Sequence, residues 1–89
     1  MKYRSRVDII AAMLEIAKEG TIKTRIMFGA SLSFTQLKEY TTFLIELGLM
    51  ERSEVGLYRT TEKGLKFLHM YMEIDNMVPK ANMLTKVVK

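Results

Sequence analysis

The sequence predicts a mainly α-helical chain that contains one small β-hairpin. Three observations predict this class: two capping boxes that each begin a run of apolar residues at helical spacing, a pair of short strand-like runs around a glycine, and a long helical pattern that closes the chain. The chain has 89 residues, enough for one small domain that buries only about two thirds of the surface of its unfolded chain. A partner subunit would therefore add to its stability.

The first helix is predicted to follow Ser5, because Ser5 and Asp8 form a capping box and apolar residues then recur at helical spacing until Gly20 can end the helix. A second, shorter helix is predicted from a Thr21 cap through Met27. The small residues at 29–31 allow only a tight corner after it. We therefore expect a short turn to connect the second helix to the third.

A second capping box, formed by Ser33 and Gln36, predicts the start of the third helix. Its apolar residues form one stripe that we expect to face the core: Leu37, Tyr40, Leu44 and Leu47. Gly48 follows at the position where a helix commonly ends with a left-handed residue. The polar residues on the opposite face of this helix are then left exposed.

Short apolar or alternating runs on either side of Val55 and Gly56 predict a β-hairpin, with the glycine supplying the positive φ that valine resists. Thr61 then caps a long closing helix. Glu62 in its first turn favours the helix dipole, and Lys66 lies four residues further on, at the spacing of a favourable ion pair. The predicted order is helix, helix, helix, hairpin, helix.

Composition excludes several kinds of site. The chain has no cysteine, which rules out disulfides, thiol catalysis and cysteine-ligated metal, and a single histidine, His69, cannot build a multi-histidine site. We find no nucleophile–base pair and no phosphate-binding glycine loop, so we expect no catalytic residues, metal, cofactor or small-molecule substrate. Asp8 and Glu15 interrupt the apolar run near the N-terminus, contrary to a signal peptide or membrane span, so we expect a cytoplasmic protein.

Positive charge is concentrated at the two ends of the sequence. The net charge is +4 and the isoelectric point is near 9.5. Residues 1–30 carry six cations and three anions, residues 31–60 three and four, and residues 61–89 five and three, giving +3, −1 and +2. This balance suits a polyanion such as nucleic acid, although it is also ordinary for a small domain. A basic tail from Lys80 leaves binding to an anionic membrane surface as an untested alternative.

Three helices with a tight corner before the third, followed by a two-stranded ribbon, is the order of a winged helix-turn-helix, whose third helix enters the major groove of DNA. Hydroxyls, amides and cations can bond phosphates or base edges. The predicted DNA-binding residues are Lys23, Arg25, Ser33, Thr35, Gln36, Lys38, Thr42, Arg52 and Arg59. Glu39, on the same face of the third helix, argues partly against this role because it repels phosphate.

Each group of cations has a second interpretation. Lys23 and Arg25 are either clamps on the DNA backbone or ordinary surface charge. The two hairpin arginines, 52 and 59, either enter the minor groove or pair across the strands with the glutamates at 51 and 54. The N-terminal cations Lys2, Arg4 and Arg6 oppose the dipole of the first helix, so they are secondary candidates for phosphate contact; the alternative is a solvated, frayed terminus.

Three stretches of the sequence resemble a known protein family. The run "KTRIMFGASLSFTQLKEY", followed by "LGLMER" and "YRTTEKGLKFL", resembles the small archaeal ten-kilodalton chromatin-type winged-helix proteins. The ArnR-type archaeal regulators share this resemblance. The resemblance covers roughly residues 5–72. It implies a DNA-binding dimer without catalysis, joined by an antiparallel coiled coil of the last helices and bound through the third helix and the wing. Pro79, within the expected coil, and a shorter C-terminus depart from that pattern.

The closing helix also predicts assembly, because apolar residues on it recur at heptad spacing. These residues are Phe67, Met70, Ile74, Met77, Ala81, Leu84 and Val88. A small domain cannot cover this row, which favours a homodimer; the alternative is that residues 67–77 complete the core of a monomer. An antiparallel partner sets Glu73 against Lys80 of the second copy twice, so charge favours that direction. Pro79 predicts a kink or a break.

We therefore expect residues 1–64 to form a winged helix-turn-helix DNA-binding domain and residues 65–89 to form a C-terminal dimerisation helix, kinked or broken near Pro79. The expected function is that of a dimeric protein that binds double-stranded DNA, as a transcriptional regulator or a chromatin-associated architectural protein of the nucleoid. The alternative is a winged-helix module that binds other proteins and no DNA.

Overall fold

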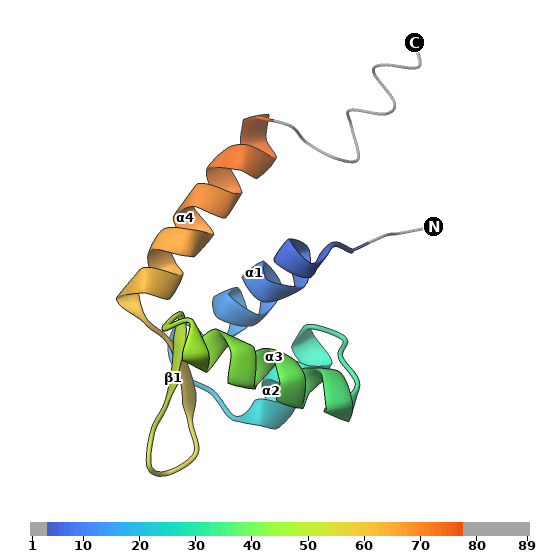
Figure 1. The fold of residues 1–89 in the computed structure, drawn as a ribbon, viewed down its shortest axis with the longest axis vertical. Coiled ribbons are helices and arrows are strands. Elements are labelled where there is room, and N and C mark those ends of the chain that lie inside the picture. Colours follow the sequence, from blue (N-terminus) through green and yellow to red (C-terminus); the bar gives the residue numbers. More distant parts are fainter. Residues whose placement is uncertain (1–3, 78–89) are drawn as a thin grey trace.

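The computed structural model describes residues 4–77 and contains four helices and one two-stranded antiparallel sheet (Figure 1). In chain order the elements are α1 (Arg6–Ile16), α2 (Lys23–Gly29), α3 (Phe34–Glu46), β1 (Met50–Arg52), β2 (Tyr58–Thr60) and α4 (Glu62–Met77). The predicted fold class, mainly α with one small hairpin, is confirmed. Among the described residues, no helix combines the length and apolar character needed to cross a bilayer.

Both predicted capping boxes are present. Ser5 Oγ accepts from the amide of Asp8 at 3.1 Å, and the Asp8 carboxylate accepts from the Ser5 amide at 3.0 Å. At the start of α3, Ser33 Oγ accepts from the Gln36 amide at 3.1 Å and Gln36 Oε1 accepts from the Ser33 amide at 2.9 Å. Each box satisfies amides that would otherwise lack a partner, which fixes where α1 and α3 begin.

The predicted cap of the second helix is wrong. The residue that precedes α2 is Ile22, and no side chain caps the helix. Thr21 is instead held as extended chain, because its amide donates to the Tyr58 carbonyl at 2.9 Å and its carbonyl accepts from the Tyr58 amide at 2.7 Å. This bridge to a residue far along the chain outweighs the local preference for a threonine cap. The helix also continues to Gly29, beyond the predicted end at Met27.

The hairpin forms where it was predicted. Glu51 lies opposite Arg59, and Gly56 in the connecting loop has a φ of +88°. The base of the hairpin is fixed to α1, since the Thr60 hydroxyl donates to the Leu14 carbonyl at 2.6 Å and the Thr60 amide to the Ala17 carbonyl at 3.0 Å. The loop closes with a 2.8 Å bond from the Ser53 amide to the Leu57 carbonyl.

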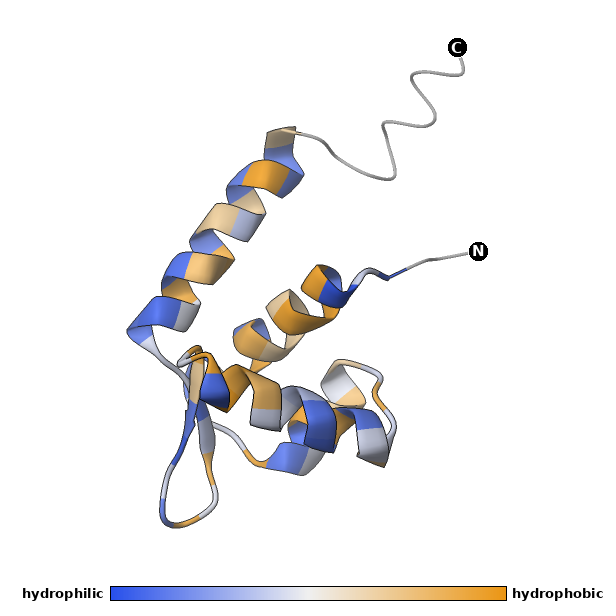
Figure 2. Cartoon of the chain, in the orientation of Figure 1, coloured by the Kyte–Doolittle hydropathy of each residue, from blue (hydrophilic) through white to orange (hydrophobic). Residues whose placement is uncertain are grey.

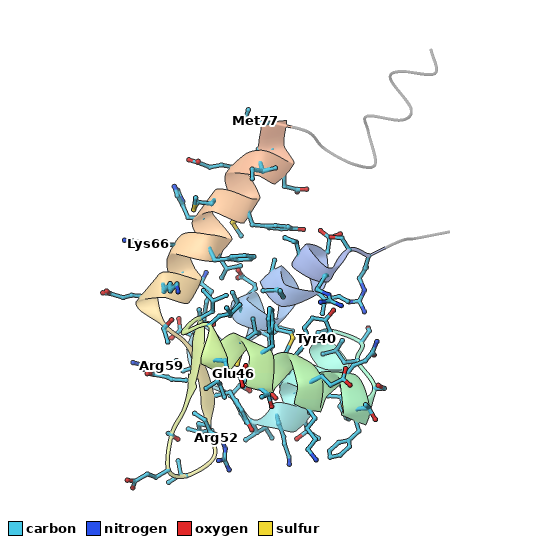
Figure 3. The ribbon with its side chains drawn as sticks, in the orientation of Figure 1. Tyr40, Glu46, Arg52, Arg59, Lys66 and Met77 are labelled. Carbon is cyan, nitrogen blue, oxygen red and sulfur yellow. The ribbon has the colours of Figure 1, made fainter. Side chains whose placement is uncertain are left out.

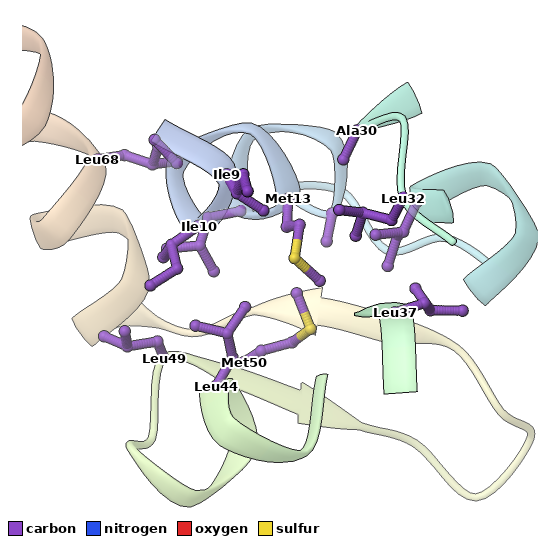
Figure 4. Packing of buried hydrophobic residues seen from close by; sticks show 14 residues of the cluster. Ile9, Ile10, Met13, Ala30, Leu32, Leu37, Leu44, Leu49, Met50 and Leu68 are labelled. Carbon is purple, nitrogen blue, oxygen red and sulfur yellow. The ribbon is translucent and has the colours of Figure 1, made fainter. Parts of the chain in front are cut away.

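One apolar core joins the first three helices to the hairpin (Figure 4). Its largest fully buried side chains are Met13, Leu14, Ile26, Leu44 and Met50. Figure 2 shows that apolar residues cover much of α1, the helix that lies between α4 and the pair α2 and α3. Burial of these side chains is the main favourable term that holds the helices in place.

The inward stripe of α3 differs from the prediction at one end. Leu37 and Leu44 are buried and Tyr40 is half-buried, as expected, but Leu47 is 41% exposed because it lies just past the end of the helix. Thr41 is buried in addition, with its hydroxyl donating to the Leu37 carbonyl at 2.8 Å. A hydroxyl satisfied within its own helix can be buried at little cost.

The start of α4 is hydrogen-bonded to the end of α3. As predicted, Thr61 caps α4: its hydroxyl oxygen accepts from the Gly64 amide at 3.1 Å. The same hydroxyl donates to the Gly48 carbonyl at 2.6 Å, and Lys63 Nζ donates to the Leu47 carbonyl at 2.8 Å. These bonds satisfy carbonyls at the C-terminus of α3 and link the start of α4 to that end of the helix.

Further along, α4 packs on α1 and then extends beyond it (Figure 1). Leu68 is buried in the core, and the Tyr71 hydroxyl donates to Asp8 Oδ1 at 2.6 Å. Among residues 4–77, Glu62 and Lys66 do not form the predicted ion pair. His69 Nε2 instead lies 3.2 Å from Glu73 Oε2, one turn further along α4. The predicted kink at residue 79 and the row positions 81, 84 and 88 lie outside the described residues.

Candidate nucleic-acid interface

The outward face of α3 is polar. Thr35, Lys38, Glu39 and Thr42 are all exposed, on the side of the helix opposite Leu37 and the other buried residues. Side chains of this kind can donate to phosphates or bond to the edges of bases. The structure therefore brings together on one helix face the positions that the sequence predicted there.

The sequence did not predict three exposed residues that lie beside these positions on α3, namely Phe34, Phe43 and Glu46. A shallow surface depression runs along α3, and its lining is Phe34, Thr35, Lys38, Glu39, Thr42, Phe43 and Glu46. Phe34 is 59% exposed and Phe43 40%. A helical wheel at about 100° per residue already directs Phe43 and Glu46 outward, so this signal was present in the sequence.

The first turn of α3 is already engaged in hydrogen bonding. Ser33 Oγ and Gln36 Oε1 both accept backbone amides of the capping box. A bidentate contact of glutamine with adenine uses both its oxygen and its nitrogen, so such a contact would compete with the capping box. The side-chain nitrogen of Gln36 can still donate to a phosphate or a base.

Lys23 of α2 lies beside the start of α3. Its Nζ is 5.9 Å from the centre of the Phe34 ring, at the outer limit of a cation–π contact. Arg25 is also exposed, but helical geometry turns it by about 200° from Lys23 around α2. Of the two predicted cations on this helix, Lys23 is the one that the structure places next to α3.

Both hairpin arginines are exposed but differ in their neighbours. Arg59 Nε lies 3.9 Å from Glu51 Oε2, with both side chains more than half exposed, which makes this a weak pair. The guanidinium of Arg52 lies 5.9 Å from the centre of the Tyr58 ring. Figure 3 shows Arg59 projecting from the side of the hairpin opposite to α3. The predicted alternative of cross-strand pairing is thus realised for Arg59, loosely.

The N-terminal cations divide between two roles. Arg4 donates to the carbonyl of Ala30 at 2.6 Å and to that of Ser31 at 3.2 Å, at a corner where Ser31 has a φ of +56°. Arg4 therefore stabilises the end of α2. Arg6 is exposed and lines a second depression beside α3, together with Gln36, Glu39, Tyr40 and Phe43. Lys2 lies outside the described residues.

Cations accordingly lie on both flanks of α3, with acidic residues between them. Lys38 and Lys23 lie on one flank, and Arg6 lies on the other. Glu39 lines both depressions, and Glu46 lines the first. Among the described residues, no ion pair includes any of these five side chains, and no group of histidine and acidic residues could hold a metal ion.

Comparison with known proteins identifies the family. A family model described as winged helix-turn-helix matches residues 3–79. The chain belongs to the winged helix-turn-helix family. An uncharacterised protein of Methanocaldococcus jannaschii is 38% identical over 80 residues, which cover 85% of this chain and 81% of that protein. The crystal structure of Sso10a-2, a DNA-binding protein from Sulfolobus solfataricus, shares the fold, with a TM-score of 0.70, 18% identity, and coverage of 97% of this chain and 98% of Sso10a-2.

Membership of the winged helix-turn-helix family assigns the parts of the structure. Helices α2 and α3 are the helix-turn-helix, α3 is the helix that in this architecture reads the major groove, and the hairpin is the wing. The relation to ArnR-type regulators, suggested by the sequence, stays a prediction. The residues expected to bind DNA all lie on α2, α3, the wing or the residue that begins α3.

Proposed function

We propose that this winged helix-turn-helix protein binds double-stranded DNA as a homodimer, without enzymatic activity, and serves in the nucleoid as a transcriptional regulator or a chromatin-associated architectural protein. The observation that carries the proposal is the exposed polar face of α3 with cations on both of its flanks. The walls of the major groove are rows of phosphates, which cations at the flanks of an inserted helix can reach. The similarity in fold to the DNA-binding protein Sso10a-2 supports the same function.

The proposed DNA contacts are led by Lys23 and Lys38, supported by the remaining predicted positions on α2, α3 and the wing. Each lysine that contacts a phosphate contributes about 0.9 to the slope of the logarithm of affinity against the logarithm of salt concentration. Lys23→Ala combined with Lys38→Ala should therefore weaken binding to a duplex and flatten this slope by about 2. Fluorescence anisotropy at four salt concentrations measures both quantities.

A matched control removes a cation elsewhere. Lys66 is exposed on α4, away from α3 (Figure 3), so Lys66→Ala, once sedimentation shows that it has the same mass as the wild type, should leave the slope unchanged. An unchanged slope and affinity in the double variant, with an unchanged melting curve, would remove Lys23 and Lys38 from the interface. Competition with bulk DNA then distinguishes the two roles: a regulator keeps high affinity for one site, whereas an architectural protein binds all duplexes with a steep dependence on salt.

The homodimer is proposed from the exposed apolar row on α4. Met70, Ile74 and Met77 are 62%, 64% and 79% exposed, while Phe67 is half-buried against the core. Leu68 occupies the face of α4 that packs on α1, so the row is a second apolar face of the same helix. Association of two such rows would remove this surface from water. In this proposal residues 1–64 bind DNA and residues 65–89 join the copies.

Sedimentation equilibrium tests the homodimer. The chain has a mass of 10.3 kDa, and a species of twice this mass is expected at micromolar concentration. Ile74→Glu should return it to the single mass, because it places a charge in the apolar row. Single-cysteine variants test the relative direction of the two α4 helices, because the chain has no cysteine of its own. If the helices run antiparallel, Met77→Cys should cross-link readily to its own copy and Phe67→Cys should not. A monomeric wild-type protein contradicts the proposal.

One observation favours a second candidate function, that of a protein-interaction module. Two of the residues on the outward face of α3, Glu39 and Glu46, are acidic, and they would repel DNA phosphates. If this candidate is right, the chain will bind no duplex at low salt, and the lysine variants at 23 and 38 will change nothing in a DNA-binding assay.

A further inference from the structure

Glu39 occupies the centre of the helix face that would enter the DNA. Taking the buried Leu37 and Leu44 as the inward direction, a rotation of about 100° per residue turns Glu39 to nearly the opposite side of α3. Thr35 and Thr42 lie one turn to either side of it on the same face. A carboxylate at this place would meet whatever lies at the floor of the groove.

The charges beside Glu39 are arranged as the major groove would require. Lys38 is turned by about 100° from Glu39 toward one flank of α3, and Arg6 lies at the other flank, next to Gln36. Phosphates form the two walls of the groove and base edges form its floor, and an α-helix fits between the walls. In this orientation the cations would meet phosphates and the carboxylate would meet bases.

A carboxylate among bases needs a hydrogen-bond donor, because leaving it desolvated and unpaired is costly. Only two bases present a donor in the major groove, the N4 amino group of cytosine and the N6 amino group of adenine. Adenine places the N7 acceptor beside its amino group, which repels an anion, whereas cytosine has no acceptor there. Cytosine is therefore the base that suits a glutamate.

We propose that Glu39 is a specificity-determining residue that accepts a hydrogen bond from the N4 amino group of a cytosine in the bound duplex. This inference rests on the proposed DNA-binding function and deepens it, because it names a base that the protein selects. Among the described residues, no ion pair includes Glu39, as a structural role for this exposed carboxylate would require. Glu46 lies seven residues on, about 10 Å along the helix, and is the matched carboxylate outside the predicted contact.

Selection from a randomised duplex library, with sequencing of the bound fraction, tests this proposal on the full chain. The wild-type protein should enrich a motif that contains one strongly preferred cytosine in each half-site, since each copy of a dimer presents one Glu39. Glu39→Gln should shift the preference at that position from cytosine toward adenine, since glutamine bonds the N6 and N7 atoms of adenine. Glu39→Ala should abolish the preference there, with a loss of about five- to 150-fold in discrimination measured on single duplexes.

Glu46→Gln is the control, and it should change overall affinity without changing the motif. Circular dichroism melting of each variant verifies folding, which these exposed positions should not affect. An unchanged motif in Glu39→Gln overturns the inference, and so does a wild-type protein that binds all duplexes equally; both outcomes leave the DNA-binding function intact. Retention of no duplex at all by the wild-type protein refutes the DNA-binding function and the inference together.

Discussion

Gly64 lies where α4 crosses the hairpin, and replacing it with alanine is expected to destabilise the fold. Gly64 is buried in the first turn of α4. A Cβ atom at this position would collide with the carbonyl oxygen of Leu49 and with Cγ2 of Thr60. The Leu49 carbonyl cannot turn away freely, because it accepts a 3.0 Å hydrogen bond from the Thr61 amide. Relief of the collision requires α4 and β1 to move apart.

Two opposing terms set the size of the effect. Alanine is favoured over glycine inside a helix by about 0.8–1.0 kcal/mol. Overpacking a well-packed site costs about 1–3 kcal/mol, and the larger part of this range applies here because the obstacle is backbone. The expected net loss is about 1–2 kcal/mol in the free energy of unfolding. For a domain of this size each kcal/mol lowers the melting temperature by about 4–8 °C, so we expect a decrease of about 4–16 °C.

Gly29→Ala is the matched control in the same protein. A Cβ at Gly29, the last residue of α2, would also be too close to a neighbour, at 2.6 Å from Ile16 Cδ1. That atom is the far end of a flexible side chain, which can rotate away, so the variant should stay within about 1 kcal/mol of the wild type. Thermal melting at one fixed protein concentration measures both variants. Equal losses in the two, or a Gly64→Ala variant as stable as the wild type, would refute the reasoning.

Three further substitutions test hydrogen bonds at the ends and in the middle of the fold. Ser33→Ala should lower the free energy of unfolding by about 1 kcal/mol in urea titration, because it removes the cap of α3; no change would mean that the box contributes nothing. Thr60→Val should cost about 1–3 kcal/mol in the same assay, since it removes the buried donor to the Leu14 carbonyl, and a neutral result would contradict this bond. Tyr71→Phe should lower the free energy of unfolding by about 1 kcal/mol, because it removes the hydrogen bond to Asp8. A melting temperature equal to that of the wild type would contradict this expectation.

Features set by neighbouring residues in the chain could be predicted from the sequence. The capping boxes at Ser5 and Ser33 and the turn at Gly56 depend on residues within a few positions, and all three are present. Thr21 was predicted wrongly as a cap because its backbone pairs with Tyr58, and no local pattern reports such a partner. For the same reason the sequence did not predict the hydrogen bonds of Arg4, whose carbonyl partners lie 26 and 27 residues away.

The candidate site was predicted in part. The wheel of α3 correctly separated the exposed Thr35, Lys38 and Thr42 from the buried side. Arg25 and Lys23 looked equivalent in sequence, but the contact of Lys23 with the Phe34 ring depends on how α2 packs beside α3, which no local pattern determines. The role of Arg6 beside α3 likewise required the packing of α1.

The hydrogen bonds of the hairpin divide it into two parts that should differ in hydrogen exchange. The Tyr58 and Thr60 amides are bonded to segments outside the hairpin, so they should exchange slowly, at rates set by opening of the whole domain. The tip beyond the Ser53 bond carries Val55, 81% exposed, and should exchange quickly. At this tip the Gly56 and Leu57 amides bond to Ser53 of the same loop, so the backbone freedom that a docked ligand could remove is confined to these few residues. Because fixing the backbone of one residue costs about 1–2 kcal/mol, docking such a wing costs far less conformational entropy than ordering an entire hairpin.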